Sequence, residues 1–430
     1  MQVKLGYKQT DVGVIPDDWN VTTIGDQFSI QLGKMLDAEK NYGVSRPYLG
    51  NRSVQWCRID LSDIGTIKLT SSDIHRFRLR KGDLLVCEGG EIGRAAIWDE
   101  PIEECYYQKA LHRLRPVCGY DVRLMLYVLQ RYSSTRFLQN FVTQTSIAHL
   151  PKEKFATVPI PIPPTQAEQE AIADALSDAQ SLIESLGQLI VKKSQLKQGA
   201  MEELLTGKKR LPGFENVAGY EQTEIGPLPK DWVLRRIGEF ATIKTGPFGT
   251  LLKASEYSEN GVPLISVGEI RDGFLRISDD TPRVSITVTR RLPQYVLKAG
   301  DIVFGRKGGV GRSALIRPNE DGWFLGSDGI SIRPTKDCHN EYLVFQFQSA
   351  RIQGWLLQNA IGTTMPSLNQ DILRKLVVPV PPTRAEQECI AAVLNDMDTE
   401  LTALEGELDH VRQVKQGMMQ ELLTGRTRLV

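Results

Sequence analysis

A glycine-rich segment with three cations is the part of this sequence best suited to bind an anion. Residues 305–312 read GRKGGVGR and carry Arg306, Lys307 and Arg312. Glycines let the backbone amides of such a turn approach a phosphate closely, and an arginine can also form two hydrogen bonds to guanine. The segment lacks the G-x-x-x-x-G-K-[ST] pattern of a nucleotide-binding loop. We therefore interpret it as a DNA-contacting turn, with an ordinary turn carrying hydrated cations as the alternative.

A polar segment further along the chain could add hydrogen bonds to the same ligand. Residues 362–373 read GTTMPSLNQDIL, in which Thr363, Thr364, Ser367 and Asn369 supply hydroxyl and amide groups. Small groups of this kind bind both phosphates and base edges. Helix and turn capping is the alternative role for them. Weaker candidates for DNA contact in the same part of the chain are Lys244, Thr245 and Arg271.

The sequence lacks the residue patterns of a catalytic or metal centre. Its 5 histidines and 6 cysteines show no H-x-H, H-E-x-x-H or C-x-x-C spacing. It also lacks the Asp/Asn-Pro-Pro-aromatic tetrapeptide expected of an adenine methyltransferase. We therefore predict no catalytic residue, no metal site and no cofactor in this chain, so any chemistry must come from partner subunits.

The chain consists of two copies of one unit. Residues 161–176, PIPPTQAEQEAIADAL, return as PVPPTRAEQECIAAVL at residues 379–394, an offset of 218 residues. Three further stretches repeat, namely 11–19 with 224–232, 79–96 with 297–314, and 197–211 with 415–429. An internal repeat of this length predicts two similarly folded parts.

The first copy carries different residues at the positions of the second copy's candidates. Arg94 matches Arg312, whereas Glu88 stands where the second copy has Arg306. An acidic side chain can accept a hydrogen bond from cytosine, and a hydrated glutamate is the alternative. The remaining first-copy candidates for DNA contact are Thr145, Ser146, His149, Lys152, Gln31, Lys34, Arg52 and Arg58. For each of them a hydrated surface role is the alternative.

Each copy must position these residues on a globular block that leads into a long helix. Thr165 with Glu168, and Thr383 with Glu386, have the spacing of a capping box, in which the hydroxyl and the carboxylate satisfy free amides of the first turn. A pair of prolines directly before each threonine excludes helix there. Two long helices are therefore expected to begin at these threonines.

Apolar residues alternate in steps of four and three along both expected helices, which is the period of a coiled-coil seam. The residues predicted to pair the helices are Ile172, Leu176, Ile183, Leu186, Ile390, Leu394, Leu401, Leu404 and Leu408. Lys197 and Lys415 interrupt the two seams at the same point. Because each block leads into the start of one helix, only an antiparallel pair avoids an unexplained return connection. Such a pair also brings the N-terminal segment near the end of the second helix.

The globular blocks are rich in short β-branched and aromatic runs bounded by turn residues, such as GDIVF and GISIRP. We expect a mainly antiparallel sheet in each, with a short helix near residues 122–141 and 341–358. The predicted fold class is α+β, with two globular domains separated by an antiparallel pair of long coiled-coil helices and an internal pseudo-two-fold repeat. The predicted boundaries are 1–160 and 212–378 for the domains, and 161–211 and 379–430 for the helices.

The charge is divided along the chain, although 52 Lys and Arg balance 52 Asp and Glu overall. Residues 1–160 and 220–378 each carry three more cations than carboxylates, whereas the helical segments carry an excess of carboxylates. This division permits DNA binding by the blocks without requiring it. The absence of an export signal and of any apolar run of roughly 18 residues predicts a cytoplasmic protein without membrane contact.

The duplicated PPTxAEQ helix, the P-x-x-W near the start of each block and the G-D-[IL]-[LV] motifs together resemble the specificity subunits of type I restriction-modification enzymes. The resemblance covers nearly the whole chain. GRKGGVGR and GTTMPSLNQDIL are typical of the target recognition domains of that family, and the first copy departs from them with CEGGEIGR and QTSIAHLPKEKF.

The resemblance implies that each block is a target recognition domain reading one half of a bipartite double-stranded DNA site, while the helices set the gap. It also implies docking of two adenine methyltransferase subunits and, through them, ATP-dependent restriction subunits, in a defence against foreign DNA. S-adenosylmethionine, ATP and Mg²⁺ are then expected in those partner subunits.

Two other functions stay open from the sequence. The chain could modify DNA itself through a site without a recognisable motif, which predicts product from DNA, magnesium and S-adenosylmethionine without a partner. It could instead be a structural coiled-coil adapter with two protein-binding heads, which predicts indifference to DNA.

Overall fold

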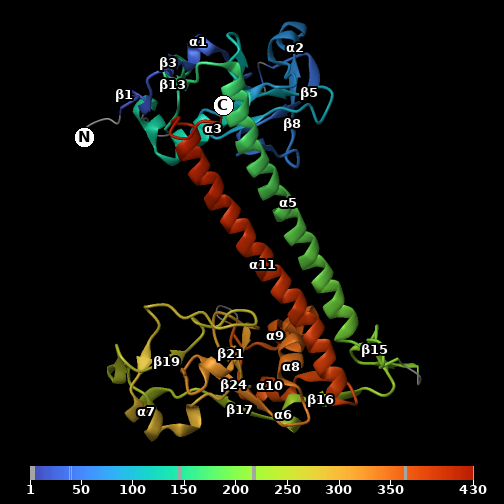
Figure 1. Ribbon diagram of the computed structural model, residues 1–430. Helices are drawn as coiled ribbons and strands as arrows, with labels where there is room; N and C mark the ends of the chain where they lie inside the picture. The colour runs from blue at the N-terminus through green and yellow to red at the C-terminus, as the bar shows by residue number, and fades with distance from the viewer. Residues whose placement is uncertain are drawn as a thin grey trace. The chain divides into compact units, whose positions relative to one another are not determined.

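The computed structural model of the chain describes residues 5–37, 39, 41–143, 148–215, 219–362 and 366–429. The chain folds into two compact units. Unit 1 joins the two ends of the sequence, Met1–Gln188 and Glu405–Val430, and unit 2 consists of Leu189–Leu404. Each unit therefore holds one globular block together with parts of both long helices (Figure 1).

Unit 1 is built on a four-stranded antiparallel sheet with the strand order β10-β9-β12-β4. Its strands are β4 (Phe28–Leu32), β9 (Leu84–Cys87), β10 (Ala95–Ile97) and β12 (Leu111–Pro116). Successive side chains of a strand point to opposite faces, so the fully buried β9 serves two cores. Leu84 and Val86 pack with helix α3 (Val122–Ser134), while Leu85 and Cys87 pack against a second, smaller sheet.

The smaller sheet of unit 1 has the order β11-β5-β8. Its strands are β5 (Val44–Leu49), β8 (Gly65–Leu69) and β11 (Tyr106–Tyr107). The remaining strands of this block are β1 (Tyr7–Thr10), β2 (Gly13–Pro16), β3 (Asn20–Thr23), β6 (Val54–Gln55), β7 (Arg58–Ile59) and β13 (Pro159–Ile162). Its short helices are α1 (Ile24–Gln27), η1 (Asn51–Ser53), α2 (Ser71–Phe77), η2 (Phe137–Phe141) and α4 (Lys152–Ala156).

Unit 2 repeats this plan with the four-stranded antiparallel sheet β17-β24-β21-β22. Its strands are β17 (Ala241–Thr245), β21 (Ile302–Gly305), β22 (Ser313–Leu315) and β24 (Gly329–Pro334). The second sheet, β18-β20-β19-β23, comprises β18 (Tyr257–Ser258), β19 (Val262–Ile265), β20 (Arg283–Val284) and β23 (Phe324–Leu325). As in unit 1, alternate residues of the inner strand serve different cores, Ile302 and Phe304 one and Val303 the other.

The other strands of unit 2 are β14 (Tyr220–Thr223), β15 (Gly226–Pro229), β16 (Val233–Arg236) and β25 (Val377–Val380). Its helices besides the long ones are α6 (Ile237–Phe240), η3 (Gly249–Leu251), η4 (Ala254–Glu256), α7 (Ile286–Arg291), η5 (Pro293–Tyr295), η6 (Pro318–Glu320), α8 (Asn340–Gln348), α9 (Ala350–Asn359) and α10 (Gln370–Lys375).

The prediction of one short helix in each block is wrong in one respect, because each predicted range contains two helices. In unit 1, Arg136 adopts a left-handed conformation with φ +58° between α3 and η2. In unit 2, Ser349 is extended between α8 and α9, and its hydroxyl accepts a hydrogen bond from the amide of Ile352. A serine that caps a new helix competes with continuation of the old one, which the apolar spacing alone does not reveal.

The long helices α5 (Gln166–Leu204) and α11 (Arg384–Leu422) begin directly after the predicted threonines. The hydroxyls of Thr165 and Thr383 accept hydrogen bonds from the amides of Glu168 and Glu386, as a capping box requires. The two carboxylates behave differently from the expectation. Both are buried, and they bind arginines instead of the helix amides, because a buried carboxylate is best compensated by a forked cation.

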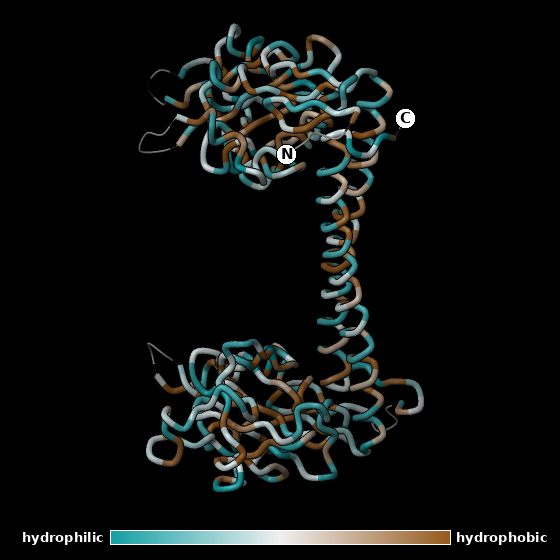
Figure 2. The backbone as a smooth tube through the Cα atoms, turned by 60° about the vertical axis from the view of Figure 1, so that its left-hand side comes forward, coloured by the Kyte–Doolittle hydropathy of each residue, from teal (hydrophilic) through white to brown (hydrophobic). Residues whose placement is uncertain are grey.

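The two long helices pair antiparallel (Figure 1). In unit 1, Ile172 and Leu176 at the start of α5 share a hydrophobic core with the end of α11. In unit 2, Ile390 and Leu394 at the start of α11 share a core with the end of α5. Hydrophobic and hydrophilic positions alternate along both helices in Figure 2. The other predicted pairing residues are buried (Leu186) or half-buried (Ile183, Leu401, Leu404 and Leu408).

The N-terminal segment contacts the end of the second long helix, as predicted. The hydroxyl of Tyr7 donates to the carbonyl of Gly425, and Gly425 has a left-handed φ of +65° that ends α11. The same contact recurs in unit 2, where the hydroxyl of Tyr220 donates to the carbonyl of Gly207. Each unit is thus closed by an equivalent hairpin packed on a helix end.

The predicted α+β class, with two globular domains, a pair of long antiparallel helices and an internal repeat, is confirmed. The boundaries at residues 160, 211 and 378 stay a prediction, because compactness groups the helix halves with the blocks that they contact. In the part of the chain that the structure describes, no helix combines the length and the apolar composition needed to cross a bilayer.

Candidate nucleic-acid interface

Four loops of unit 2 converge where the strands of its main sheet end or begin. We call residues 245–247, 305–312, 326–328 and 366–369 the second loop cluster. The cluster is tightly built: a Cβ on Gly246 would come within 1.8 Å of the carbonyl oxygen of Gly326. The amide of Arg306 donates to the carbonyl of Asp328 at 2.8 Å, which fixes two of the loops together.

The two segments singled out in the second copy lie side by side in this cluster. Lys307 and Ser367 form an antiparallel bridge, and the amide of Leu368 donates to the carbonyl of Arg306 at 2.9 Å. The hydroxyl of Ser367 donates to the carbonyl of Ile361 at 3.2 Å. Thr363 and Thr364 lie outside the described residues. The glycine-rich turn and the polar segment therefore form one surface, although they are far apart in the sequence.

The cations of the glycine-rich turn are available to a ligand. Lys307 and Arg312 are exposed and Arg306 is half-buried. None of the three side chains has a hydrogen bond or an ion pair with a residue that the structure describes. The turn itself is held by helix α9, because the side-chain amide of Gln353 donates to the carbonyl of Gly311 at 2.9 Å. A fixed backbone with free cations is an arrangement suited to phosphates or guanine.

The other second-copy candidates have partners inside the protein. Lys244 donates to the carbonyl of Gln294, and the hydroxyl of Thr245 accepts from the amide of Gln370. Arg271 donates to carbonyls of its own loop, those of Gly268 and Ile270. Asn369 caps α10 by accepting from the amide of Ile372 at 2.9 Å. Thr245 and Asn369 thus have structural roles within the second loop cluster, whereas Lys244 and Arg271 bind carbonyls outside it. The contact of all four residues with DNA stays a prediction.

Unit 1 contains the equivalent first loop cluster, which we define as residues 32–34, 87–94, 108–110 and 148–151. Gly89 and His149 form an antiparallel bridge, 218 residues before the bridge of Lys307 and Ser367. The amide of Leu150 donates to the carbonyl of Glu88 at 2.8 Å, which matches the bond between Leu368 and Arg306. The two clusters therefore share one backbone arrangement.

Three first-copy candidates are engaged within the protein. Arg94 donates to the backbone carbonyl and the side-chain oxygen of Asn51, and it forms an ion pair with Glu91. The side-chain oxygen of Gln31 accepts from Arg113 at 2.7 Å. Lys34 forms an ion pair with Asp73 at 2.9 Å. These contacts give each side chain a structural role.

Other first-copy candidates face solvent. Arg52, Arg58 and Lys152 are exposed and make no side-chain hydrogen bond or ion pair with a described residue. Arg52 lies close to the first loop cluster, because the side chain of its neighbour Asn51 donates to the carbonyl of Gly89 at 2.8 Å. His149 is half-buried within the cluster. Thr145 and Ser146 lie outside the described residues.

Burial shapes the electrostatics of the first loop cluster. His112 is fully buried, and its Nε2 lies 2.8 Å from the carbonyl oxygen of Leu150. Burial lowers the pKa of His112 to about 4, so the ring is neutral near pH 7 and donates from Nε2 to that carbonyl. Burial also raises the pKa of the Glu88 carboxyl, against the opposing effect of His149 and Lys109. Two of the three cations of the first loop cluster, Lys34 and Arg94, also have partners inside the protein, whereas the three of the second loop cluster have none among the described residues.

Sequence reasoning missed Lys109. It is exposed in the connection between β11 and β12, and its backbone amide donates to the carbonyl of Lys34 at 2.8 Å. The second copy has Ser327 at the corresponding position, so the repeat gave no signal for this lysine. Only the fold brings it to the first loop cluster.

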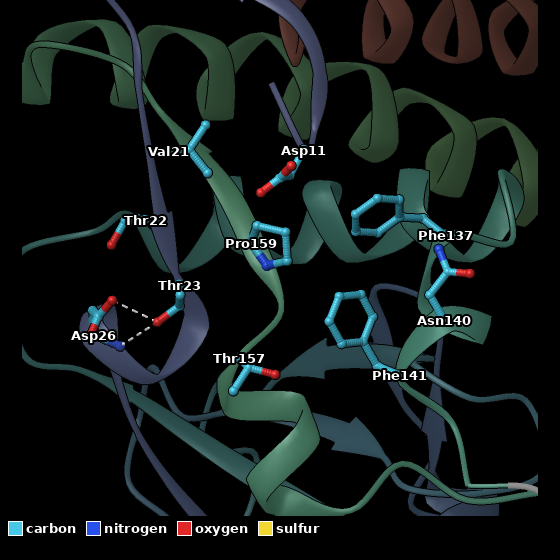
Figure 3. Close-up of a pocket in the computed structure, with 10 residues that line it drawn as sticks. All are labelled: Asp11, Val21, Thr22, Thr23, Asp26, Phe137, Asn140, Phe141, Thr157 and Pro159. Atoms are coloured by element: carbon cyan, nitrogen blue, oxygen red, sulfur yellow. Dashed lines mark hydrogen bonds between the residues drawn. The ribbon is translucent and has the colours of Figure 1, made fainter. Parts of the chain in front are cut away.

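Unit 1 contains a hollow, shown in Figure 3, whose lining includes Thr23 and Asp26. These two residues precede β4, whereas the first loop cluster begins at the other end of that strand. Phe137 and Phe141 lie next to each other in its wall, and Asp11 and Asp26 contribute carboxylates. The hydroxyl of Thr23 donates a hydrogen bond to Oδ2 of Asp26 at 2.7 Å. The lining contains no lysine or arginine, so this hollow is unsuited to a phosphate backbone. In the described ranges, no group of three His, Cys, Asp or Glu side chains could hold a metal ion.

Comparison with known proteins agrees with the two-copy arrangement. The chain matches the family of type I restriction modification DNA specificity domains over residues 16–192 and again over residues 229–411. It is similar to the type I restriction enzyme MjaVIII specificity subunit of Methanocaldococcus jannaschii, with 27% identity across 96% of this chain and 94% of the relative. The putative MjaX specificity subunit of the same organism is 24% identical, across 98% of this chain and 97% of the relative.

Solved structures share the fold. The S subunit of a type I restriction-modification system from M. genitalium matches with a TM-score of 0.61 and 18% identity over 98% of both chains. A chain from a structural study of complex assembly and conformational transition in the type I R-M system matches with a TM-score of 0.56 and 15% identity, over 96% of this chain and 99% of the other. The chain belongs to the family of type I restriction-modification DNA specificity domains, of which it carries two copies, and it is a specificity subunit.

Proposed function

We propose that the two loop clusters read the two halves of one bipartite duplex DNA site. The observation that carries this proposal is the equivalence of the bridges Gly89–His149 and Lys307–Ser367. Both copies offer the same backbone arrangement to a ligand, but with different side chains. Two loop clusters with the same backbone but different side chains are expected to bind two half-sites that differ in sequence.

Phosphate contact in the second half-site is assigned to Lys307 and Arg312, whose side chains are exposed and unpaired in the described structure. In the first half-site, Arg52, Lys109 and Lys152 take this role, since they are exposed around the first loop cluster. Contacts to phosphates fix the register of the protein on DNA, and contacts to base edges then select the sequence.

The long helices set the gap between the half-sites and dock two adenine methyltransferase subunits. Exposed apolar side chains support the docking role: Leu182, Leu189 and Leu196 recur every seven residues on α5 and are 45%, 37% and 51% exposed. Methyltransferase subunits would cover them and supply S-adenosylmethionine chemistry, while restriction subunits would supply ATP-dependent cleavage with Mg²⁺. The chain itself contributes recognition and geometry.

The test is selection from random duplexes by the full chain together with methyltransferase subunits of the same system, followed by sequencing of the bound DNA. The expected result is two short conserved sequences at a fixed separation. Uniform recovery of all duplexes would contradict the proposal and favour an adapter with two protein-binding heads. Incubation of the chain alone with DNA, magnesium and S-adenosylmethionine should give no methylated or cleaved product.

A further inference from the structure

Residues 88 and 306 occupy the same held position in the two loop clusters. Each is the first residue after an inner strand of the main sheet: Glu88 follows β9, and Arg306 follows β21. The amide of Glu88 donates to the carbonyl of Ala110 at 2.9 Å, and its carbonyl accepts from the amide of Leu150. The amide of Arg306 donates to Asp328 at 2.8 Å, and its carbonyl accepts from Leu368. Every partner is offset by 218 residues.

The side chains at this position have no hydrogen-bond partner among the described residues. Glu88 and Arg306 are both half-buried, and neither forms a side-chain hydrogen bond or ion pair with a described residue. A partly buried charged group without a partner is costly, and an approaching ligand that supplies the missing hydrogen bonds removes that cost. The groups that act electrostatically on Glu88 are His149, Lys109 and Glu153, and burial outweighs them in raising its pKa. The carboxylate is thus held, partly desolvated and free to accept.

The two side chains are complementary to the two bases of one kind of base pair. A carboxylate accepts from the exocyclic amino group of cytosine, and an arginine donates two hydrogen bonds to O6 and N7 of guanine. We propose that residues 88 and 306 are equivalent base-reading positions, at which Glu88 selects a cytosine in the first half-site and Arg306 selects a guanine in the second. This inference rests on the proposed function, because it names the reading residue of each loop cluster.

The competing role for Glu88 is a carboxylate that merely repels nearby phosphates. The two roles differ in outcome when Glu88→Gln removes the charge without changing the shape. A base reader loses selectivity at one base pair of the first half-site only. If Glu88 only repels phosphates, removing its charge should increase the affinity of the protein for all duplexes equally.

The experiment repeats the duplex selection with the full chain and methyltransferase subunits carrying Glu88→Gln, Arg306→Gln or the control Glu153→Gln. Glu153 is an exposed carboxylate of α4 close to the first loop cluster, so its loss removes the same charge from the same region. Glu88→Gln should reduce the preference for cytosine at one position by roughly tenfold or more and leave the second half-site unchanged. Arg306→Gln should do the reverse for one guanine, and Glu153→Gln should change neither.

Unchanged base preferences in Glu88→Gln, or equal strengthening of binding to every duplex, would overturn the inference. The unaffected half-site reports folding within the same molecules, and thermal melting of each variant checks it independently. If the unsubstituted chain selects no bases in the first half-site, the proposed function fails. If it selects bases and Glu88→Gln retains the same preferences, only the role of Glu88 fails.

Discussion

The ammonium group of Lys415 donates to the side-chain oxygen of Gln180 at 2.7 Å, and this contact joins α11 to α5 inside unit 1. Gln130 of α3 accepts from the same ammonium at 3.0 Å, and the ring of Tyr127 lies 4.9 Å from it. The equivalent residue in unit 2, Lys197, forms an ion pair with Asp398. The two equivalent seam lysines therefore differ in their partners: Lys415 binds neutral amide oxygens, and Lys197 binds a carboxylate.

Lys415→Met should stabilise the protein, whereas Lys197→Met should not. Lys415 is 5% exposed, its hydrogen-bond acceptors among the described residues are neutral, and burial lowers its pKa, so its charge opposes folding. Methionine fills the same space without that cost, for a gain of about 1 kcal/mol. Lys197→Met leaves Asp398 half-exposed without its cation and removes a favourable pair. Thermal melting of both variants should show a higher melting temperature for Lys415→Met but not for Lys197→Met. Equal changes in melting temperature would contradict this prediction.

Arg210→Ala should be strongly destabilising. Arg210 binds the buried carboxylate of Glu386, at 2.5 Å from its Nε, and also binds Asp231. Removal of one partner of a buried pair leaves a charge without compensation, at a cost of about 3 kcal/mol. Urea denaturation at pH 7 measures it.

The equivalent Arg428→Ala provides the control for this pair. Arg428 binds Glu168 and Asp18 in unit 1, but its side chain is 33% exposed against 6% for Arg210. Water can therefore replace more of the lost interaction, and the loss of stability should be smaller. A larger loss for Arg428→Ala would show that burial does not rank the two sites.

The two long helices and the two similar blocks could be predicted because each follows from a short sequence pattern. The 218-residue offset, the prolines before Thr165 and Thr383 and the seam period each need only a short window of sequence. The same offset then placed the polar segment around Ser367 in correspondence with His149, and the structure pairs each with its own glycine-rich turn. Periodicity and repetition therefore predicted the helices and the equivalence of the two blocks.

The roles of single cations could not be predicted in this way. Arg94 matches Arg312 in sequence, but it is held by Asn51, which lies 43 residues earlier on η1. Lys34 likewise meets Asp73 across 39 residues. Such partners are brought together only by the fold, so the repeat could not distinguish a structural arginine from a free one. Lys109 was missed for the converse reason, since only its position in the folded block gives it meaning.

His112→Ile should flatten the dependence of stability on pH between about 6.5 and 4. The pKa of His112 is about 4 in the folded protein, against 6.5 for an unperturbed histidine. In that window the unfolded chain binds more protons, so folding stability falls as the pH falls, by about 3 kcal/mol in total. Isoleucine is the residue at the corresponding position 330 and cannot titrate. Urea denaturation at pH 7 and pH 4.5 should show a smaller difference for the variant, and an unchanged difference would contradict the role of His112.

Arg312→Gln should reduce the dependence of DNA binding on salt. Each phosphate contact that is lost lowers the slope of log affinity against log salt concentration by about 1. Arg317 is the matched control, because it is also exposed but follows the far end of β22, away from the second loop cluster. Binding titrations at several salt concentrations should show a reduced slope for Arg312→Gln and the original slope for Arg317→Gln.

Lengthening both long helices by one heptad should widen the gap between the half-sites without changing either half-sequence. Lys415 meets Gln180 and Lys197 meets Asp398, so seven residues inserted after Gln188 in α5 and opposite them after Glu407 in α11 preserve both contacts. Seven residues add about 10 Å of helix, which corresponds to about three base pairs of duplex. Selection from random duplexes should return the same two half-sequences, further apart. An insertion in α5 alone breaks the pairing of the two seams and should lower the melting temperature. Altered half-sequences at an unchanged gap would show that the helices do not set the distance.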